Sequence, residues 1–311
     1  MTITLTPDKK FIDVSAYDAD RENPAKPGTF LYDIPFNWNI QYAGGACLAA
    51  IKSSEWVTDP AFLMNWKGAG DAGLIRIAWH YFHPSVNAIS QAANFIKLMN
   101  QAGLTWTGDP LTSDKVALDF ENADGINAKD TMRAAASFYY EVHKALPQFE
   151  FVMYTGPAFW NSLRVMGADT TWVGSIKLWL ATYPLDPTSS TKNPPPVFDR
   201  TTVDMIAQNV LNNVYCDVPL TGWKEITYRQ ITGHADSKQI PGYTGHAVAC
   251  DVDVCFTDIP RRQPVQPVDV TSSGSQTSPQ TNGSQAGVTL DDLARRVTAL
   301  EAAARKNGWV V

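Results

Sequence analysis

The feature that most constrains the fold of this chain is a regular alternation of strand-like and helix-like segments before residue 260. Helical patterns occupy Asp59–Ala69, Ala88–Ala102, Ala128–Leu146 and Pro157–Met166. The strand-like runs between and around them are Phe11–Ser15, Cys47–Ser53, Leu74–Phe82, Lys115–Glu121, Phe149–Tyr154, Ile176–Ala181, Ile226–Ile231 and Val248–Phe256. Strands that alternate with helices indicate a parallel sheet, and eight such strands in roughly 250 residues predict an α/β barrel.

The later connections are less regular. Residues Tyr183–Val197 are rich in Pro, Ser and Thr, which predicts an excursion loop before a helix at Arg200–Asn213. An open, doubly wound sheet is the alternative architecture. No glycine-rich phosphate-binding turn follows the first strand, so the sequence favours the barrel.

Charge and hydropathy exclude several classes of function. The chain has 25 basic and 31 acidic residues, a net charge of -6, and no basic cluster longer than an arginine pair. We therefore expect no binding to nucleic acid. No run of eighteen apolar residues occurs, so we expect no membrane span. Residues 1–10 lack a basic region followed by an apolar core, which predicts synthesis in a cytoplasm without a signal peptide.

The cysteines lack the spacing of a metal site. Cys250 and Cys255 are five residues apart, and His246 precedes Cys250 by four, but nothing completes a ligand set. We interpret these two cysteines, with Cys47 and Cys216, as small buried residues. We predict no metal and no cofactor.

The composition changes near residue 260. Residues 264–288 are rich in Pro, Ser, Thr, Gln and Gly and carry one charge, Asp269. Such a segment buries too little apolar surface to fold, so it is predicted to be a flexible linker. A helix then follows at Thr289–Lys306, with an apolar seam from Leu290 to Leu300. The predicted domains are a barrel at 1–260, a linker at 261–288 and an amphipathic helix at 289–311.

A lone helix of this length is marginal in water, so its apolar seam should find a partner. We expect the helix to form a homo-oligomer by self-association. The alternative is that it docks onto the large domain.

Acidic and aromatic residues gather where the predicted strands end. In a parallel barrel, chemistry takes place at the carboxyl ends of the strands. Carboxyl groups supply acid, base and charge stabilisation, and flat rings stack on the apolar faces of sugars. The residues at these ends therefore predict a sugar-cleaving site: Asp13, Trp79, Tyr81, Asp119, Glu121, Tyr154, Trp179, Asp251 and Asp253.

Asp119 and Glu121 carry most of this prediction. Residues two apart on a strand point to the same face. Burial and a neighbouring like charge should raise the pKa of one carboxyl, so that it holds a proton while the other is ionised. Glu121 has the longer side chain, so we assign it as the acid. Their separation favours water attack with inversion, or participation by a 2-acetamido group of the substrate, over a carboxylate nucleophile.

The body of the chain also resembles glycoside hydrolase family 25, the muramidase-type lysozymes often found as phage endolysins. The similarity is an ordered series of short pieces over about 245 residues. Among the pieces are Phe11-Ile-Asp-Val-Ser15, Ala50-Ile-Lys-Ser-Ser-Glu55, Ala78-Trp-His-Tyr81, Leu118-Asp-Phe-Glu121 and Leu178-Trp-Leu-Ala-Thr-Tyr183, followed by Arg229-Gln-Ile231, Pro241-Gly and Asp251-Val-Asp253.

The resemblance implies a TIM-like (β/α)5(β)3 barrel that cleaves the β-1,4 bond between N-acetylmuramic acid and N-acetylglucosamine in bacterial peptidoglycan. It implies that Glu121 is the proton donor and that Asp119 orients the 2-acetamido group or a water. Asp13 and one late aspartate would complete the acidic floor. The chain is one residue longer than the family pattern between Asp251 and Phe256, which leaves Asp251 and Asp253 as alternatives; we assign Asp251. Substrate contacts are assigned to Trp79, Tyr81, Tyr154, Trp179 and Asp253.

The sequence leaves three functions to compare. The first is a phage endolysin, made in the host cytoplasm and acting on the cell wall after the membrane is permeabilised. The second is a non-catalytic glycan-binding or virion-structural module, which the retained carboxylates Asp13, Asp119 and Glu121 disfavour. The third is a hydrolase of another acetamido glycan, such as chitin.

Overall fold

The computed structural model describes residues 5–19, 21–22, 30–31, 36–184, 197–212, 222–223, 225–243 and 249–264. The predicted linker beyond Pro264, the helix predicted at 289–311 and Cys216 lie outside these residues. The three described cysteines, Cys47, Cys250 and Cys255, are buried and free.

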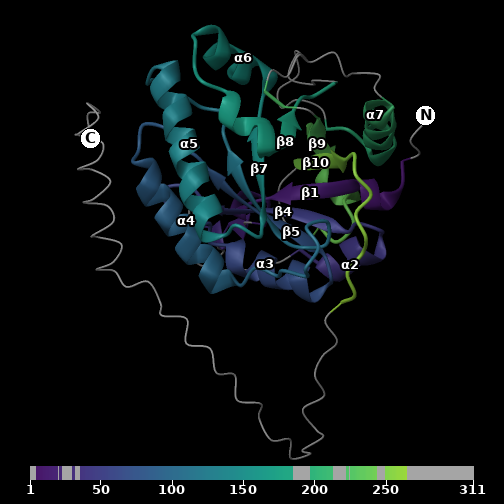
Figure 1. The fold of residues 1–311 in the computed structure, drawn as a ribbon. Coiled ribbons are helices and arrows are strands. Elements are labelled where there is room, and N and C mark those ends of the chain that lie inside the picture. The colour runs from purple at the N-terminus through teal and green to yellow at the C-terminus, as the bar shows by residue number, and fades with distance from the viewer. Residues whose placement is uncertain are drawn as a thin grey trace, which may run out of the picture. The chain divides into compact units, whose positions relative to one another are not determined.

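Eight strands close into a barrel (Figure 1). In the order given below, each of the first six pairs in parallel with the next, and β10 pairs antiparallel with both β9 and β1. The predicted barrel is therefore confirmed. Its strands are β1 (Lys10–Val14), β4 (Leu48–Ser54), β5 (Ile75–Tyr81), β6 (Lys115–Asp119), β7 (Glu150–Thr155), β8 (Lys177–Ala181), β9 (Ile226–Asp236) and β10 (Ala249–Cys255).

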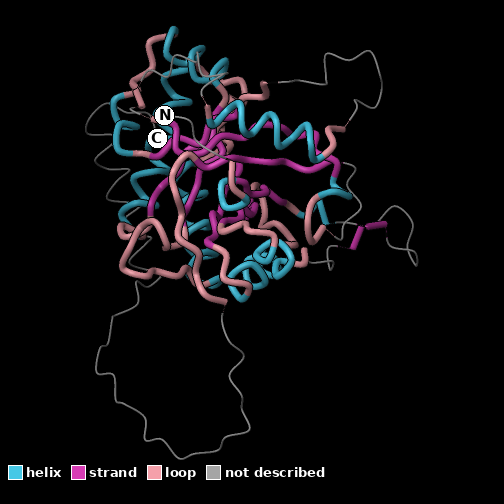
Figure 2. The backbone as a smooth tube through the Cα atoms, turned by 90° about the vertical axis from the view of Figure 1, so that its right-hand side faces the viewer, coloured by secondary structure: helices cyan, strands magenta, loops and turns pink. Residues whose placement is uncertain are grey.

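Helices surround the strands, as Figure 2 shows in cyan around magenta. Those that follow the first five barrel strands are α2 (Trp38–Ala43), α3 (Phe62–Asp71), α4 (Ala88–Ala102), α5 (Ala128–Ala145) and α6 (Pro157–Val165). A further helix, α7 (Arg200–Leu211), follows β8. Short elements complete the description: the 3-10 turns at Pro7–Lys9, Thr171–Ser175 and Ser237–Gln239, α1 (Ala16–Ala19), and the small sheet of β2 (Arg21–Glu22) and β3 (Phe30–Leu31). None of the described helices has the length and apolar character needed to cross a membrane.

Side-chain oxygens set the beginnings of three of these helices. Asn87 accepts a hydrogen bond from the Ser90 amide at the start of α4, and Asn127 accepts one from Asp130 at the start of α5. Asp199 does the same for α7. Such caps satisfy amides that have no partner within the helix, so they fix where each strand–helix connection ends.

The barrel interior has an apolar layer, and a polar layer lies next to it toward the carboxyl ends of the parallel strands. On β5, Ile75 and Ile77 belong to the buried interior cluster, and Trp79 packs against it. On β6, Ala117 occupies the same layer, and Asp119 comes two residues later on the same face. The outward face of β6 instead carries Leu118, which packs with the helices in a separate cluster. Alternation along each strand therefore carries the polar residues to one end of the barrel interior.

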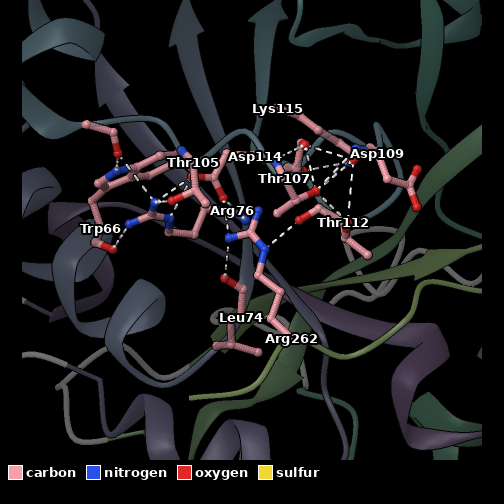
Figure 3. Close-up of polar contacts among 12 residues, drawn as sticks. Trp66, Leu74, Arg76, Thr105, Thr107, Asp109, Thr112, Asp114, Lys115 and Arg262 are labelled. Carbon is pink, nitrogen blue, oxygen red and sulfur yellow. Dashed lines mark hydrogen bonds and ion pairs between the residues drawn. The ribbon is translucent and has the colours of Figure 1, made fainter. Parts of the chain in front are cut away.

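The opposite end is closed by a buried charge network (Figure 3). Asp114, which is fully buried just before β6, accepts hydrogen bonds from Arg76 and from Arg262. Arg262 also donates to the carbonyls of Leu74 and Thr112. The segment after β10 is thus attached to the base of the barrel, at positions where the sequence predicts the linker to have begun.

Candidate active site

A pocket of about 310 Å³ opens at the carboxyl ends of the parallel strands. It contains eight of the nine side chains that the sequence analysis selected; the ninth, Asp253, is not in its lining. The lining residues are Asp13, Ser15, Lys52, Trp79, Tyr81, Asp119, Glu121, Tyr154, Trp179, Tyr183, Gln230 and Asp251.

Strand register brings these residues into one ring. Tyr81 on β5 lies opposite Asp119 on β6, which in turn lies opposite Tyr154 on β7, and Tyr154 lies opposite Trp179 on β8. Asp251 stands near the beginning of β10 and pairs with Asp13 on β1. Because β10 is antiparallel to β1, its beginning lies at the end of the barrel where β1 finishes.

Asp119 and Glu121 line the same pocket although β6 is shorter than predicted. The strand ends at Asp119, whereas the sequence analysis carried it to Glu121. Phe120 between them turns outward against Phe82 and Phe159, with ring centroids at 6.0 and 5.1 Å. The Phe120 amide still donates to the Tyr154 carbonyl, so the backbone stays extended beside β7 and the two carboxyls share a side.

Burial distinguishes the two carboxyls. Asp119 is 7% exposed, and desolvation together with the charge of Glu121 raises its pKa well above the usual range, which the Lys52 charge partly opposes. Glu121 stands at the exposed rim, and desolvation by its surroundings also raises its pKa. Within the described part of the chain, Asp119 Oδ1 is buried and accepts no hydrogen bond.

The indoles of two tryptophans donate hydrogen bonds to two further carboxyl groups, Asp13 and Asp253. Trp79 Nε1 donates to Asp13 Oδ1 at 2.6 Å, and Trp179 Nε1 donates to Asp253 Oδ1 at 2.7 Å. Burial, together with the charges of neighbouring aspartates, raises the pKa of Asp13 and of Asp253 well above the usual range. Asp253 is fully buried, so the structure places it beneath the pocket, as a support for Trp179.

Asp251, by contrast, lies in the pocket wall. Burial, followed by the charges of Asp18 and Glu121, raises its pKa to about 7. The two late aspartates alternate along the same inward face of β10. They differ in how deep they lie in the barrel: Asp251 lines the pocket, and Asp253 is fully buried. The spacing of the two residues in the sequence does not reveal this difference.

The rings differ in how they meet the pocket. Trp79 and Tyr81 are half-buried at its edge, whereas Tyr154 and Trp179 are buried in its floor. Tyr154 and Trp179 pack edge-to-face with centroids 5.1 Å apart. Among these four rings, Trp79 and Tyr81 therefore have surface free to meet a sugar; Tyr183, which also lines the pocket, is 41% exposed.

Four lining residues were not predicted from the sequence: Ser15, Lys52, Tyr183 and Gln230. Lys52 follows Leu48 and Ala50 at two-residue spacing on β4, so the alternation rule applied to that strand would have found it. Gln230 accepts hydrogen bonds from the hydroxyls of Tyr154 and Tyr183, at 2.7 and 2.6 Å. It therefore fixes both phenols, a role that local sequence does not reveal. Within the described ranges, no three His, Cys, Asp or Glu side chains are grouped as metal ligands.

A closed α/β barrel whose strand ends present acidic groups beside aromatic rings is the arrangement of a glycoside hydrolase. The sequence model of glycosyl hydrolases family 25 matches residues 12–204, more than half of the chain. The protein belongs to this family.

Individual relatives are distant. Lysozyme M1 of Streptomyces globisporus is 29% identical over 133 residues, 40% of this chain and 44% of that protein. The uncharacterized protein YegX of Escherichia coli K12 is 30% identical over 116 residues, 37% of this chain and 39% of that protein. The matched segments thus span less than half the length of these two relatives.

Solved structures share the fold over a longer part of the chain. A bacterial lysozyme from Streptomyces coelicolor superimposes with a TM-score of 0.53 at 19% identity, covering 80% of this chain and 92% of that one. The catalytic domain of the endolysin ply40, from bacteriophage P40 of Listeria monocytogenes, superimposes with a TM-score of 0.50 at 16% sequence identity. The match covers 81% of this chain and 94% of that one.

Proposed function

We propose that this protein is a peptidoglycan hydrolase, an N-acetylmuramidase that cleaves the β-1,4 bond between N-acetylmuramic acid and N-acetylglucosamine. The observation that carries the proposal is the pairing of Asp119 and Glu121 in one pocket edged by Trp79 and Tyr81. Membership of glycosyl hydrolases family 25 and the similarity to Lysozyme M1 support the choice of glycan.

Glu121 is the proton donor in this mechanism. Its raised pKa keeps a proton on the carboxyl to a higher pH than an ordinary glutamate does, and its position at the rim lets it meet the glycosidic oxygen. Proton transfer to that oxygen releases the leaving sugar as an alcohol while positive charge develops on the sugar that remains in the pocket.

Asp119 orients the group that attacks from the other side. Its buried Oδ1 has no partner in the described structure and is free to accept a hydrogen bond from the N–H of a 2-acetamido group or from a water. An ionised Asp119 would also stabilise the oxocarbenium-like transition state, and so would Asp13 and Asp251 when ionised. Inversion and acetamido-assisted retention both remain compatible with this role; proton NMR of the first-formed anomer distinguishes them.

Trp79 and Tyr81 hold the sugar. Their half-buried rings flank the carboxyls, and Lys52 Nζ lies 5.4 Å from the Trp79 ring centroid and 5.5 Å from that of Tyr81. The Lys52 cation, which also lines the pocket, therefore attracts both rings through cation–π interaction. Tyr154 and Trp179 form the floor.

Mass spectrometry of digested peptidoglycan tests the proposal. Products with N-acetylmuramic acid at the reducing end are expected from the wild type, and Glu121→Gln should reduce their release about 10²–10⁴-fold, the range that general acids contribute. Glu141→Gln, on α5, is the matched control. Release of N-acetylglucosamine reducing ends, equal digestion of chitin, or wall binding without any release would each contradict the proposal.

We further propose the role of a phage endolysin that acts from the host cytoplasm. The similarity in fold to an endolysin catalytic domain supports it. Bacteria expressing the protein should remain intact until chloroform permeabilises the inner membrane and then lyse, and cells expressing Glu121→Gln should not. Lysis without permeabilisation would contradict this role.

A further inference from the structure

A second depression lies beside the catalytic pocket. It is a groove of about 410 Å³ between the loop Glu55–Thr58, which follows β4, and one face of α4. We call it the Trp56 groove. Its lining residues are Ser54, Glu55, Trp56, Val57, Thr58, His80, Val86, Ser90, Gln91, Asn94, Lys97, Leu98 and Gln101.

The loop that carries Trp56 is tightly closed. Ser54 and Thr58 form an isolated antiparallel bridge, and the Glu55 amide donates to the Val57 carbonyl at 2.9 Å. Trp56 is the residue enclosed by that three-residue turn. Trp56 is 62% exposed, so a large apolar ring faces solvent at the groove.

One face of the Trp56 ring is held in place. It stacks on His83 with centroids 3.6 Å apart and an interplanar angle of 22°. His83 is itself fixed, because Nε2 lies 3.1 Å from Glu55 Oε1 and Nδ1 lies 3.3 Å from the carboxylate of Asp124. A clamped imidazole therefore supports the indole at a set angle, and little further ordering of this ring is needed when a ligand binds.

Polar side chains face the indole from α4. Ser90, Asn94, Lys97 and Gln101 follow one another at spacings of four, three and four residues, so they form one exposed stripe along the helix. Three of the four are neutral hydroxyl or amide groups, which can both donate and accept hydrogen bonds. Such a stripe suits a chain rich in hydroxyl and amide groups.

The groove and the catalytic pocket share an ion pair. Glu55 lines the groove, Lys52 lines the pocket, and Lys52 Nζ donates to Glu55 Oε2 at 2.8 Å. Bonds from Lys52 and His83 lower the pKa of Glu55 although partial burial opposes this. This charged pair thus joins the lining of one depression to that of the other.

We propose that the Trp56 groove binds a part of the same glycan strand outside the scission site. The indole stacks on an apolar sugar face, and the α4 stripe bonds to hydroxyl and acetamido groups. A polar rim around one rigid aromatic anchor is the arrangement that gives such sites affinity. The inference rests on the proposed function for its choice of glycan, but it can be tested by binding alone.

The binding experiment uses the full chain carrying Glu121→Gln, so that no substrate is consumed. Its probe is peptide-free glycan strands prepared from peptidoglycan. Adding Trp56→Ala should weaken binding to long strands about tenfold, while Trp106→Ala leaves it unchanged. Trp106 is the matched control because it is also exposed, at 42%, and packs on Phe149 away from the groove. Unchanged binding by the Trp56 variant would overturn the proposal.

The kinetic experiment keeps Glu121 intact. Trp56→Ala should lower kcat/KM for long strands through a higher KM and leave that for a tetrasaccharide within about twofold of wild type. Equal losses on both substrates would mean that Trp56 only supports the pocket through His83, which overturns the proposal. Inactive wild-type protein with intact strand binding would instead contradict the proposed function and leave the groove supported.

The α4 stripe has its own control. Asn94→Ala should weaken binding to the long strands, and Asn100→Ala, an exposed asparagine on the same helix outside the groove, should not. If Asn94→Ala affected only strands that still carry stem peptides, the groove would bind peptide and the proposal would be wrong.

Discussion

Trp79 donates its indole hydrogen to Asp13 across the intervening strand β4, at 2.6 Å. The same ring presents its half-buried face to the pocket, so one side chain both contacts the sugar site and positions an acidic group. Trp179 repeats the arrangement with Asp253 deeper in the barrel. These indoles are hydrogen-bond donors as well as apolar surfaces, which accounts for the burial of carboxyls beside them.

Removing the Trp79 donor should therefore change the titration of Asp13. Burial raises the pKa of Asp13 and the Trp79 bond lowers it, so Trp79→Phe should raise that pKa further. If Asp13 acts when ionised, the acidic limb of the kcat/KM profile moves to higher pH, with about a tenfold loss at pH 5. Trp106→Phe is the control. If kcat/KM fell but the acidic limb did not shift, Trp79 would contact the sugar without affecting the pKa of Asp13.

Lys52 should lower the pKa of Asp119, as Trp79 lowers that of Asp13. Its charge lowers a pKa that burial and Glu121 raise, so Lys52→Met should raise the pKa of Asp119 and move the acidic limb upward by about one pH unit. The profile of kcat/KM between pH 4 and 8 measures this shift. Lys67→Met, which breaks an exposed pair with Asp71, should leave the limb unchanged. A downward shift would show that the Lys52 charge does not govern Asp119.

The buried carboxyls should also invert the usual pH dependence of stability. Burial raises the pKa of Asp253 well above the usual range and that of Asp251 to about 7. Above the unfolded-state pKa of about 4, the folded protein keeps protons that the unfolded chain releases. Raising the pH through this window therefore favours unfolding, by up to about 1.4 kcal/mol per pH unit for each such proton.

Urea unfolding at pH 5, 6, 7 and 8 measures that slope. We expect the free energy of unfolding to fall with pH in the wild type and to fall less steeply in Asp253→Asn, whose amide oxygen can still accept the Trp179 bond. Asp258→Asn is the control, since that carboxyl is 91% exposed. An identical slope in Asp253→Asn would show that Asp253 does not retain its proton on folding.

Much of the fold and site was predictable because the barrel imposes it. Alternating strands and helices force parallel strands, and parallel strands bring residues as distant as Asp13 and Trp179 to one end. Helix bounds such as Ala88–Ala102 agreed with the structure because apolar periodicity and an Asn87 cap coincide there. The residues at predicted strand ends then entered one pocket without any knowledge of tertiary contacts.

What escaped prediction depends on depth or on distant partners. Asp251 and Asp253 lie two residues apart on β10, but Asp251 lines the pocket and Asp253 is fully buried, a difference that spacing does not encode. Trp56 lies in a loop, and its ring stacks on His83, a contact that the local sequence does not reveal. Arg262 follows the last strand in a Pro-rich context that indicates a linker, yet it pairs with Asp114, 148 residues earlier.

The pair of Arg262 and Asp114 leads to a prediction about the stability of the base of the barrel. Asp114 is fully buried and faces Arg76 and Arg262, with Arg262 Nη1 at 2.9 Å from Oδ1. Asp114→Asn keeps the shape but leaves two arginines without a counter-ion, so it should reduce the free energy of unfolding by about 3–5 kcal/mol. Arg262→Met leaves Arg76 paired and should reduce it by less. Asp71→Asn, which breaks an exposed pair, should change it by less than about 1 kcal/mol. Chemical denaturation of the three variants measures the order. An Asp114→Asn protein as stable as the Asp71→Asn control would show that the network does not attach the segment after β10 to the barrel.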